Sequence, residues 1–344
     1  MTKLSLFTIC ASNYLAQAVV LGASVRQYHP DTPLIVFLID EAPAGVDLPD
    51  SLLIIPARQV FERREWNHLR CHYSLLEFAT SVKPACFRYV FDSGSEQAVY
   101  LDPDLKLFER IDQFWGEGTT NPELVLTPHL LSPLPNDGRM PDDLVILRAG
   151  TYNLGFAAMR NTASIHVLLD WWDQKLRTWC FEDVRTGVFT DQKWMDFAPL
   201  IVSNATVLRH IGYNAAYWNL HERSPRIHDY HWCMEDQAGV LHRLVFFHFS
   251  GFNPEKKELS RYETRFGWDL PGEGQALFES YASALKQAGY VRFREIGMPK
   301  VTFEDGVDWD NGCRTLYRQS IAEGLGMVCT TRREAKFGHE LMSI

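Results

Sequence analysis

The clearest single feature of this sequence is Val99-Tyr100-Leu101-Asp102-Pro103-Asp104. Its apolar first half is typical of a buried strand, which here runs into two carboxylates separated by one proline. The proline removes a backbone N–H donor and stiffens the turn. Two carboxylates at a strand end can both reach a hard divalent cation, directly or through water. Many isolated pairs of this kind are only solvated loop residues, so the pair needs partners elsewhere in the chain before it indicates a site.

Other short apolar runs predict further strands, and segments with helical spacing of apolar residues separate them. This order predicts an α/β domain whose sheet is covered by helices on both faces. Beyond about residue 255 charged, helix-like segments replace the strands, so we expect a main domain over 1–255 and a helical C-terminal extension over 256–344. The expected strands are 4–10, 34–39, 52–55, 98–101, 124–127, 152–159 and 244–249, and the expected helices are 13–28, 66–81, one starting at Lys83, 162–180, 191–202, 274–289 and 311–324.

The composition is ordinary for a soluble globular protein, with 344 residues, 46% hydrophobic and 22% charged. A net charge of −9 argues against a nucleic-acid binder, which would more often be basic.

The seven cysteines are scattered without a Cys-x-x-Cys pair, which argues against structural zinc or a disulfide framework and favours free thiols in a reducing cytosol. No apolar run approaches the ~20 residues of a membrane span, and the apolar N-terminal stretch is too short for a signal peptide. We therefore expect a cytoplasmic protein of undetermined oligomeric state.

A basic C-terminal segment carries Arg332, Arg333 and Lys336. It has two interpretations: a solvated helix face, or peripheral contact with the anionic inner face of a membrane or with a lipid-linked substrate.

A histidine follows another very apolar run, in His248-Phe249-Ser250-Gly251. An imidazole at a strand end can be a metal ligand or a hydrogen-bonded core residue. Together Asp102, Asp104 and His248 would form a mixed oxygen and nitrogen shell that suits Mn²⁺ as well as Mg²⁺. Gly251 would allow the backbone to approach a phosphate closely.

Two further short motifs lie between these segments. In Asn153-Leu154-Gly155-Phe156 a small residue beside an amide suits a sugar-recognition wall, while the alternative is a β-bulge glycine. Asp191-Gln192 stands at the start of an expected helix, where Asp191 is either an N-terminal cap or a contact to the donor sugar or the reacting centre.

A mixed aromatic and polar cluster spans residues 217–223. Aromatic rings with polar neighbours often hold sugars, so Trp218, Asn219 or His221 is a candidate to line the acceptor or sugar-donor site.

In this order, the motifs resemble those of glycosyltransferase family 8 and its relatives. That family has Asp-x-Asp after Tyr-Leu, then Phe-Asn-x-Gly, then Asp-Gln, then His-x-x-Gly-x-x-Lys-Pro. The segment Thr8-Ile9-Cys10-Ala11-Ser12-Asn13-Tyr14 also resembles the family's nucleotide-binding first strand and loop. The resemblance covers about residues 4–255. It implies a GT-A type, Rossmann-like mixed sheet flanked by helices.

The resemblance also implies roles for individual residues. Asp102, Asp104 and His248 would bind Mn²⁺ or Mg²⁺, and Asp191 and Gln192 would lie near the anomeric carbon as catalytic residues. The residues that it places at the nucleotide-sugar donor are Thr8, Ser12 and Tyr14 at the nucleotide, Lys83 or Arg88 beside the donor, Asn153 and Gly155 at the sugar, and Gly251 at the phosphates.

The chain departs from the family pattern at two places. Asn253-Pro254-Glu255-Lys256 stands where the family has Lys-Pro, so the phosphate-binding lysine is either absent or replaced by Lys256 or Lys257. Lys193 follows Asp-Gln where the family commonly has another aspartate, which weakens any proposal of a carboxylate nucleophile there.

The resulting hypothesis is a metal-dependent hexosyltransferase. It would move a sugar from a nucleotide-sugar, a UDP-sugar in most of the family, to a glycan or lipid-linked acceptor, with retention of configuration, in surface polysaccharide synthesis. One alternative is a nucleotidyltransferase, although residues 10–14 lack the glycine-rich loop that such an enzyme needs. The other is a non-catalytic glycan-binding or scaffold protein on a transferase fold.

Overall fold

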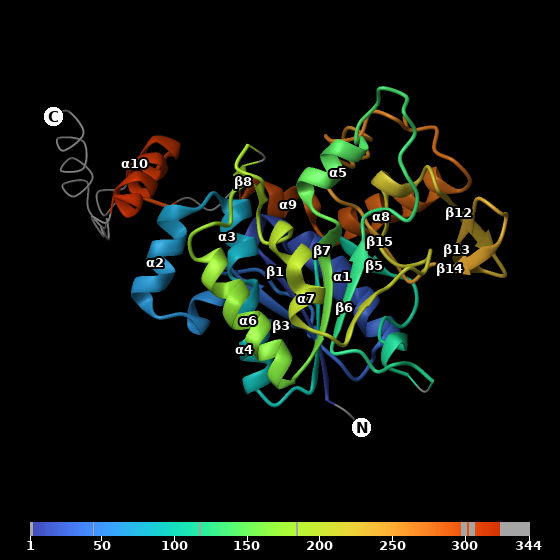
Figure 1. The fold of residues 1–344 in the computed structure, drawn as a ribbon. Coiled ribbons are helices and arrows are strands. Elements are labelled where there is room, and N and C mark those ends of the chain that lie inside the picture. The colour runs from blue at the N-terminus through green and yellow to red at the C-terminus, as the bar shows by residue number, and fades with distance from the viewer. Residues whose placement is uncertain are drawn as a thin grey trace.

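The computed structural model describes residues 3–43, 45–116, 118–183, 185–296, 301–302 and 307–323. At its centre lies a seven-stranded sheet in the order β10-β6-β7-β4-β1-β2-β3, with helices on both faces (Figure 1). This arrangement confirms the expected α/β class. The strands of this sheet are β1 (Leu4–Cys10), β2 (Leu34–Leu38), β3 (Leu52–Pro56), β4 (Gln97–Leu101), β6 (Leu124–Pro128), β7 (Tyr152–Arg160) and β10 (Ala205–Val207).

The strand directions make the sheet mixed. β1 pairs in parallel with β2 and β4, and β2 pairs in parallel with β3. β7 runs antiparallel to both β4 and β6. β10 pairs in parallel with β6, so six of the seven strands in this sheet run in the same direction. Their carboxyl ends therefore lie along one edge of the sheet, and the segment after β4 leaves from that edge.

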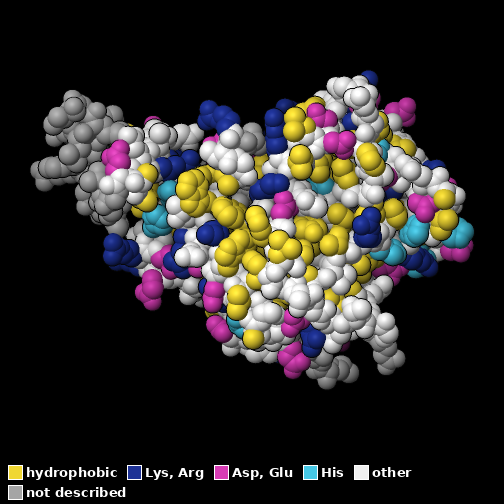
Figure 2. All heavy atoms as spheres, viewed as in Figure 1, with side chains coloured by type: hydrophobic (Ala, Val, Ile, Leu, Met, Phe, Trp, Pro, Cys, Tyr) yellow, Lys and Arg dark blue, Asp and Glu magenta, His cyan; other side chains and the backbone are white. Residues whose placement is uncertain are grey.

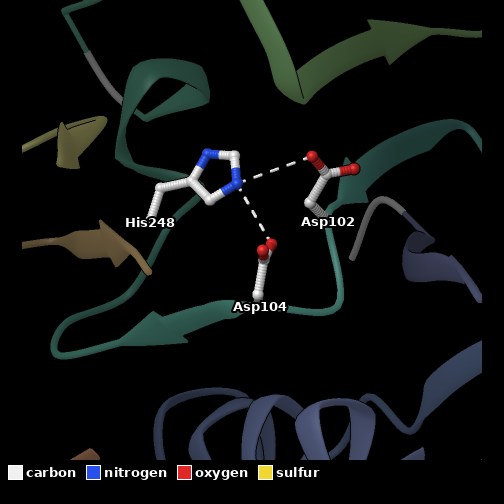
Figure 3. Close-up of side chains that lie close together, drawn as sticks. All are labelled: Asp102, Asp104 and His248. Atoms are coloured by element: carbon white, nitrogen blue, oxygen red, sulfur yellow. Dashed lines mark ion pairs between the residues drawn. The ribbon is translucent and has the colours of Figure 1, made fainter. Parts of the chain in front are cut away.

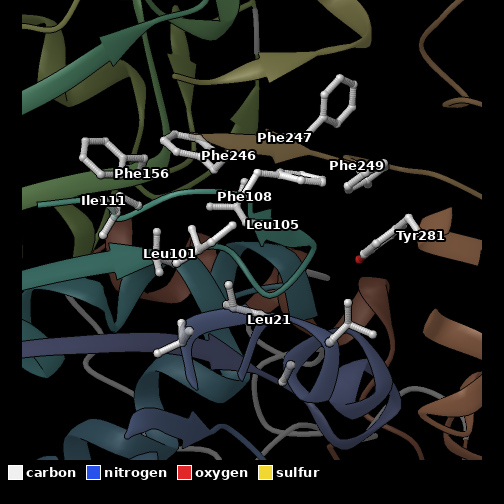
Figure 4. Close-up of a cluster of buried hydrophobic side chains, with 14 of the residues drawn as sticks. Leu21, Leu101, Leu105, Phe108, Ile111, Phe156, Phe246, Phe247, Phe249 and Tyr281 are labelled. Carbon is white, nitrogen blue, oxygen red and sulfur yellow. The ribbon is translucent and has the colours of Figure 1, made fainter. Parts of the chain in front are cut away.

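Alternating side chains along each strand enter two separate hydrophobic clusters, as a sheet covered on both faces requires. In β4, Val99 and Leu101 belong to one cluster and Tyr100 to the other. The first cluster, drawn in Figure 4, is covered by α1 (Leu15–Tyr28) and α8 (Gly274–Gln287). The second is covered by α4 (Lys83–Asp92) and α6 (Ala163–Leu176).

The single helix expected over 66–81 is wrong, because the structure has two helices, α2 (Arg63–His72) and α3 (Leu75–Ser81). Ser74 caps α3: its hydroxyl accepts from the backbone N–H of Glu77, whose carboxylate accepts from the N–H of Ser74. Such a capping box starts a new helix, so the chain turns between the two segments.

The segment expected as the short helix 191–202 begins with a 3-10 turn, η4 (Lys193–Phe197), before α7 (Ala198–Ile201). A further short helix, α5 (Asp143–Ala149), was not expected, and none of its side chains is buried. Figure 2 shows hydrophobic side chains gathered over the face that carries α5, α6 and α7, where Leu147 and Leu200 are 65% and 82% exposed.

The C-terminal part is helical in the residues described, with α8, α9 (Tyr290–Glu295) and α10 (Asn311–Ala322). α8 and α9 contribute Phe278, Tyr281 and Phe293 to the first hydrophobic cluster. α10 packs on α2, where the indole Nε1 of Trp309 donates to the backbone oxygen of Cys71 at 2.9 Å. Arg332, Arg333 and Lys336 lie outside the described residues. In the described part of the chain, no helix has the length and apolar character to cross a bilayer.

Three smaller sheets complete the fold. Of their strands the sequence predicted only β15, as the expected strand 244–249. β5 (Leu105–Leu107) and β11 (Ala215–Ala216) flank β15 (Phe246–His248). β12 (Arg223–His228), β13 (His231–Asp236) and β14 (Leu241–Arg243) form an antiparallel meander, and β8 (Glu182–Asp183) pairs with β9 (Val188–Phe189).

Candidate metal centre and its surroundings

The structure brings together the side chains of Asp102, Asp104 and His248 (Figure 3). The imidazole Nε2 of His248 lies 3.0 Å from Oδ1 of Asp104 and 3.6 Å from Oδ2 of Asp102. One ligand atom from each residue lies within 4.8 Å of the others. Two carboxylates and an imidazole at this spacing can enclose a single divalent cation.

Backbone pairing accounts for this convergence. The N–H of Asp102 donates to the oxygen of Gly155 at 2.8 Å, which holds the end of β4 against β7. The chain then turns into β5, which pairs antiparallel with β15 and places His248 opposite Leu105. The N–H of Phe249 donates to the oxygen of Asp104 at 3.0 Å. The register between β5 and β15 thus sets the distance between the two halves of the cluster.

Within the cluster, the attraction between opposite charges and the effect of burial shift the pKa values in opposite directions. Burial raises the pKa of Asp102, against the lowering effect of the Lys83 and His248 charges. Burial alone would lower the pKa of His248, but the carboxylates of Asp104 and Asp102 outweigh burial, and that pKa is raised. The cluster therefore favours positive charge at its centre, which a proton or a metal ion can supply.

A buried lysine lies behind the carboxylates. The ammonium group of Lys83 contacts Oδ2 of Asp191 at 2.6 Å, donates to the oxygen of Leu154 at 2.9 Å and lies 4.1 Å from the centroid of the Tyr100 ring. The hydroxyl of Tyr100 donates to Asp102. The predicted residues Lys83 and Asp191 are thus paired with each other, and Tyr100 connects them to the candidate metal cluster that Asp102, Asp104 and His248 form.

Arg88, the alternative to Lys83, lies one helical turn and a half further along α4. Its guanidinium pairs with Asp170 of α6 at 2.5 Å and lies 3.6 Å from Asp173. The structure therefore directs Arg88 toward α6, whereas Lys83 points to the cluster.

Asn153, Gly155 and Gln192 lie beside the imidazole. The Oδ1 atom of Asn153 lies 3.1 Å from Nδ1 of His248. Gln192 accepts from the N–H of Leu154 at 2.9 Å and donates to the oxygen of Ala149 at 3.0 Å. All three of these predicted residues are buried. Both ends of the Gln192 amide form hydrogen bonds with the backbone.

The aromatic and polar cluster of residues 217–223 contributes one ring to the site. The Trp218 ring lies edge-on to His248 with centroids 5.2 Å apart, and its Nε1 is buried without a hydrogen-bond partner among the described residues. Asn219 is fully buried and binds the backbone at Ala216, Asn214 and His129. The side chain of His221 contacts Ser132 at 3.3 Å. Of the three candidates, Trp218 is the one that contacts a residue of the metal cluster.

A loop is anchored beside this cluster. The carboxylate of Glu222 accepts from the N–H groups of Leu131 and Ser132 at 3.0 and 2.6 Å, and it pairs with the buried guanidinium of Arg223. Further along the same loop, Asp137 pairs with Arg265 at 2.9 Å. Residues 131–137 are thus bound at both ends to later parts of the chain.

The predicted nucleotide-binding residues Thr8, Ser12 and Tyr14 lie in β1 and in the segment that follows it, and Asp40 after β2 lies beside them. Ser12 donates its N–H to both carboxylate oxygens of Asp40 at 2.9 and 3.1 Å, and its hydroxyl donates to Oδ2 at 2.5 Å. Asp40 was not predicted, although its place directly after a buried strand is the signal that selected Asp102. Thr8 is fully buried, and its hydroxyl has no partner among the described residues.

Tyr14 connects this region to the metal cluster. Burial, followed by the negative charge of Asp104, raises the pKa of Tyr14 to about 12, and the charge of Arg261 opposes that rise. Tyr14 is 41% exposed, so part of its ring faces solvent. Two charged groups that are far apart in the sequence, Asp104 and Arg261, therefore act on one tyrosine.

Gly251 follows the metal-cluster histidine in a left-handed conformation, with φ of 70°. A Cβ atom there would lie 2.7 Å from the hydroxyl oxygen of Ser260, so glycine is required for the close approach as well as for the backbone. This contact places Arg261 next to the turn. Lys257, in contrast, lies over the Trp268 ring, 5.4 Å from its centroid. Arg261 is thus a cation near the turn that the sequence did not single out.

No protein-family model matches this chain. The chain is 23% identical to the uncharacterized protein YfnF of Bacillus subtilis (strain 168) over 249 residues, which cover 71% of this chain and 80% of YfnF. It is also 23% identical to the uncharacterized protein YfnD of the same organism over 251 residues, which cover 71% of this chain and 76% of YfnD.

Solved structures of glycosyltransferases are among those similar to this chain. The galactosyltransferase LgtC, in complex with donor and acceptor sugar analogues, is 14% identical with a TM-score of 0.45, and the match covers 83% of this chain and 99% of LgtC. The bifunctional glycosyltransferase WbbM, in its apo structure, is 10% identical with a TM-score of 0.43, and the match covers 86% of this chain and 51% of WbbM.

Proposed function

We propose that this chain is a metal-dependent glycosyltransferase that moves a hexose from a nucleotide-sugar, with a UDP-sugar as the expected donor, to a glycan or lipid-linked acceptor. The observation that carries the proposal is the convergence of Asp102, Asp104 and His248 at the carboxyl edge of a sheet. Ligands of α/β sheets bind outside the carboxyl ends of the strands.

The residues present fit a divalent cation. Nε2 of His248 faces two carboxylates that are both hydrogen-bond acceptors. That arrangement is stable when a positive charge lies between the three groups. A bound Mn²⁺ or Mg²⁺ would neutralise the charge of a sugar-donor diphosphate.

The nucleotide is proposed to bind between the metal cluster and the first two strands. Ser12 and Asp40 form a fixed polar pair there, Tyr14 lies near the carboxylates, and Thr8 has a buried hydroxyl without a partner in the described residues. We assign the phosphates to the turn at Gly251, where a backbone without a Cβ atom permits close approach. Arg261, next to that turn, is the cation that we propose in place of the missing lysine.

The sugar is proposed to lie against Asn153, Gly155, Asp191 and Gln192. Asp191 is neutralised by Lys83 at 2.6 Å, which does not favour a carboxylate nucleophile. We therefore propose retention without a covalent intermediate. The acceptor oxygen forms its bond to the anomeric carbon on the face from which the donor phosphate leaves, and the acceptor proton passes to that phosphate.

The remaining assignments concern the surroundings of the reaction. We propose that the protein works in the cytoplasm, at or near the inner face of the membrane, in synthesis of a surface polysaccharide. We also propose residues 1–255 as the catalytic domain and 256–344 as its helical extension. No nucleic acid is proposed as a partner.

The test is hydrolysis of nucleotide-sugars by the full chain, measured as released nucleotide across a panel of sugar donors with Mn²⁺. We expect one donor to be cleaved, and we expect chelator, Asp102→Asn and Asp104→Asn each to abolish cleavage. Asp50→Asn, an exposed carboxylate far along the chain from the cluster, is the matched control and should retain full activity. Full activity of the two cluster variants in chelator would contradict the proposal.

The donor panel and one further assay separate the alternatives. A nucleotidyltransferase would convert a sugar phosphate and a nucleoside triphosphate to a nucleotide-sugar and pyrophosphate, which is measured as released pyrophosphate. A scaffold or glycan-binding protein would leave the whole panel uncleaved and would bind no metal in calorimetry.

A further inference from the structure

The amide of Asn153 has only one orientation that satisfies its neighbours. The backbone N–H of Gly155, which can only donate, lies 3.3 Å from Oδ1 of Asn153. On the other side, Nδ2 of Asn153 lies 3.4 Å from Oε1 of Gln192. Exchanging the oxygen and nitrogen of the amide would place donor against donor and acceptor against acceptor.

Gln192 is itself fixed in the same way. Its Oε1 accepts from the N–H of Leu154 at 2.9 Å, and its Nε2 donates to the oxygen of Ala149 at 3.0 Å. Because backbone groups cannot exchange their roles, Oε1 of Gln192 must face Asn153 as an acceptor. Two backbone N–H groups, of Leu154 and Gly155, therefore determine both amides.

This chain of hydrogen bonds determines the proton on His248. Oδ1 of Asn153 lies 3.1 Å from Nδ1 of His248, and an oxygen acceptor requires a proton on that nitrogen. In the neutral imidazole the other nitrogen, Nε2, then carries the lone pair. That lone pair points toward Asp104 and Asp102, where a cation ligand is needed.

The ring is also held in place by packing. A Cβ atom on Gly155 would lie 2.5 Å from Cε1 of His248 and 2.8 Å from its Nδ1, so the imidazole rests directly on the glycine. The Trp218 ring packs edge-on against the imidazole, 5.2 Å from it between centroids. The imidazole is 3% exposed, and its neighbours leave it one orientation.

We propose that Asn153 is a positioning residue that holds His248 as the Nδ1–H tautomer and directs Nε2 to the metal. This inference rests on the metal site of the proposed function and adds to it the group that orients one ligand. Partners behind metal-bound histidines typically influence metal affinity by about 10- to 100-fold. Asn153 reaches the metal only through His248, so its effect should be visible in metal binding without any sugar donor.

The test measures the affinity of the full chain for Mn²⁺ alone by isothermal titration calorimetry. Asn153→Leu has a similar volume but no acceptor, and we expect it to weaken Mn²⁺ binding by about 10- to 100-fold. Asn153→Asp retains an acceptor oxygen and should bind Mn²⁺ within a few-fold of the wild type. Asn204→Leu, an exposed asparagine before β10, controls for the loss of an amide elsewhere.

Two further measurements secure the result. Nitrogen chemical shifts of the histidine rings in ¹⁵N-labelled protein saturated with Mg²⁺ should show Nδ1 protonated in the wild type. The Cβ atom of Gly155→Ala would lie 2.5 Å from Cε1 of His248 and 2.8 Å from Oδ1 of Asn153, so this variant disturbs the same contact from the other side. It should also weaken Mn²⁺ binding, and it replaces Asn153→Leu if that variant does not fold.

The outcomes are distinct. Wild-type affinity in Asn153→Leu, or an equal loss in Asn153→Leu and Asn153→Asp, would overturn the inference while leaving the metal site intact. A wild-type protein that binds no Mn²⁺ would overturn the metal-dependent function itself, and the inference with it.

Discussion

The ammonium group of Lys83 and the carboxylate of Asp191 form an ion pair of 2.6 Å in which both side chains are almost completely buried. Lys83 is the first residue of α4, and Asp191 follows β9. The same ammonium donates to the oxygen of Leu154 in β7. One cation thus connects three segments directly behind the metal cluster.

Removing one partner of this pair should destabilise the fold. Lys83→Met leaves the Asp191 carboxylate buried without a counter-charge, at a cost of about 3 to 5 kcal/mol. The double variant Lys83→Met/Asp191→Leu should recover most of that loss, because neither charge is then buried. Urea denaturation followed by circular dichroism measures both. A double variant no more stable than Lys83→Met would show that packing, and not charge, determines the effect.

Metal binding should stabilise the wild type and not the cluster variants. Cation at about 100 times its dissociation constant adds about 2.7 kcal/mol to the unfolding free energy of a protein that binds it only when folded. Asp104→Asn should lose this increment, while its stability without metal should equal or exceed that of the wild type because one carboxylate beside Asp102 is gone. Thermal unfolding with and without Mn²⁺ tests the prediction, and an unchanged Mn²⁺ effect in Asp104→Asn would contradict it.

Acid should destabilise the protein through two buried histidines. Burial lowers the pKa of His72 and of His129 from 6.5 to about 4. Below pH 6.5 the unfolded chain binds protons that the folded chain does not, so stability falls as the pH decreases toward 4 and then levels off for these two groups. Above pH 6.5 both states are neutral at these positions and the effect vanishes.

His72→Phe isolates half of this effect. It keeps a ring that packs against Tyr73 and Phe181 but cannot take up a proton. The loss of stability between pH 6.5 and pH 4, from urea midpoints, should be smaller than in the wild type. His228→Gln, at an exposed histidine, should leave the wild-type pH dependence unchanged.

Glu222 should control the order of the loop that follows His129. Glu222→Gln removes the negative charge beside the buried Arg223 and weakens the hold on Leu131 and Ser132, at a cost of about 3 to 5 kcal/mol. Hydrogen exchange at the amides of Leu131 and Ser132 should become faster. Glu96→Gln, at an exposed position, is the control, and equal exchange rates in both variants would contradict the prediction.

Truncation should show that the proposed catalytic domain needs α8 and α9 to fold. The Phe249 ring stacks on Tyr281 of α8 with centroids 3.8 Å apart and an interplanar angle of 7°. A chain ending at residue 255 would expose this ring and its neighbours, as Figure 4 illustrates, and should bind a hydrophobic dye and aggregate. A chain ending at residue 296 should remain folded. A stable, monomeric 1–255 fragment would contradict this expectation.

Local patterns in the sequence were sufficient for most of the main sheet and for the three candidate ligands. Apolar runs indicated β1, β2, β3, β4, β6 and β7 but not the short edge strand β10. Strand-end polar residues indicated Asp102, Asp104 and His248, which the structure brings together. Their roles as metal ligands stay predictions. The same strand-end rule would have found Asp40, because that carboxylate directly follows a buried run.

Pairing between distant segments was beyond those patterns. The meander of β12, β13 and β14 lacks a strong alternation, since Arg223 is buried while Ile227 is 52% exposed. The contact between Asn153 and His248 depends on the register of β5 against β15, which no local spacing encodes. The break between α2 and α3 did have a local signal, Ser74 and Glu77 three residues apart, which the helical periodicity on either side obscured.

The pairing of β5 with β15 has a consequence for biosynthesis. Because chains emerge from the ribosome N-terminal end first, Asp102 and Asp104 are made long before the strand that carries His248. β1, β2, β3 and β4 can already pair at that stage, but β5 lacks its neighbour. A nascent chain can therefore complete the proposed cation-binding centre only after β15 has been made, and metal uptake by ribosome-bound intermediates of increasing length would mark the moment at which β15 joins the fold.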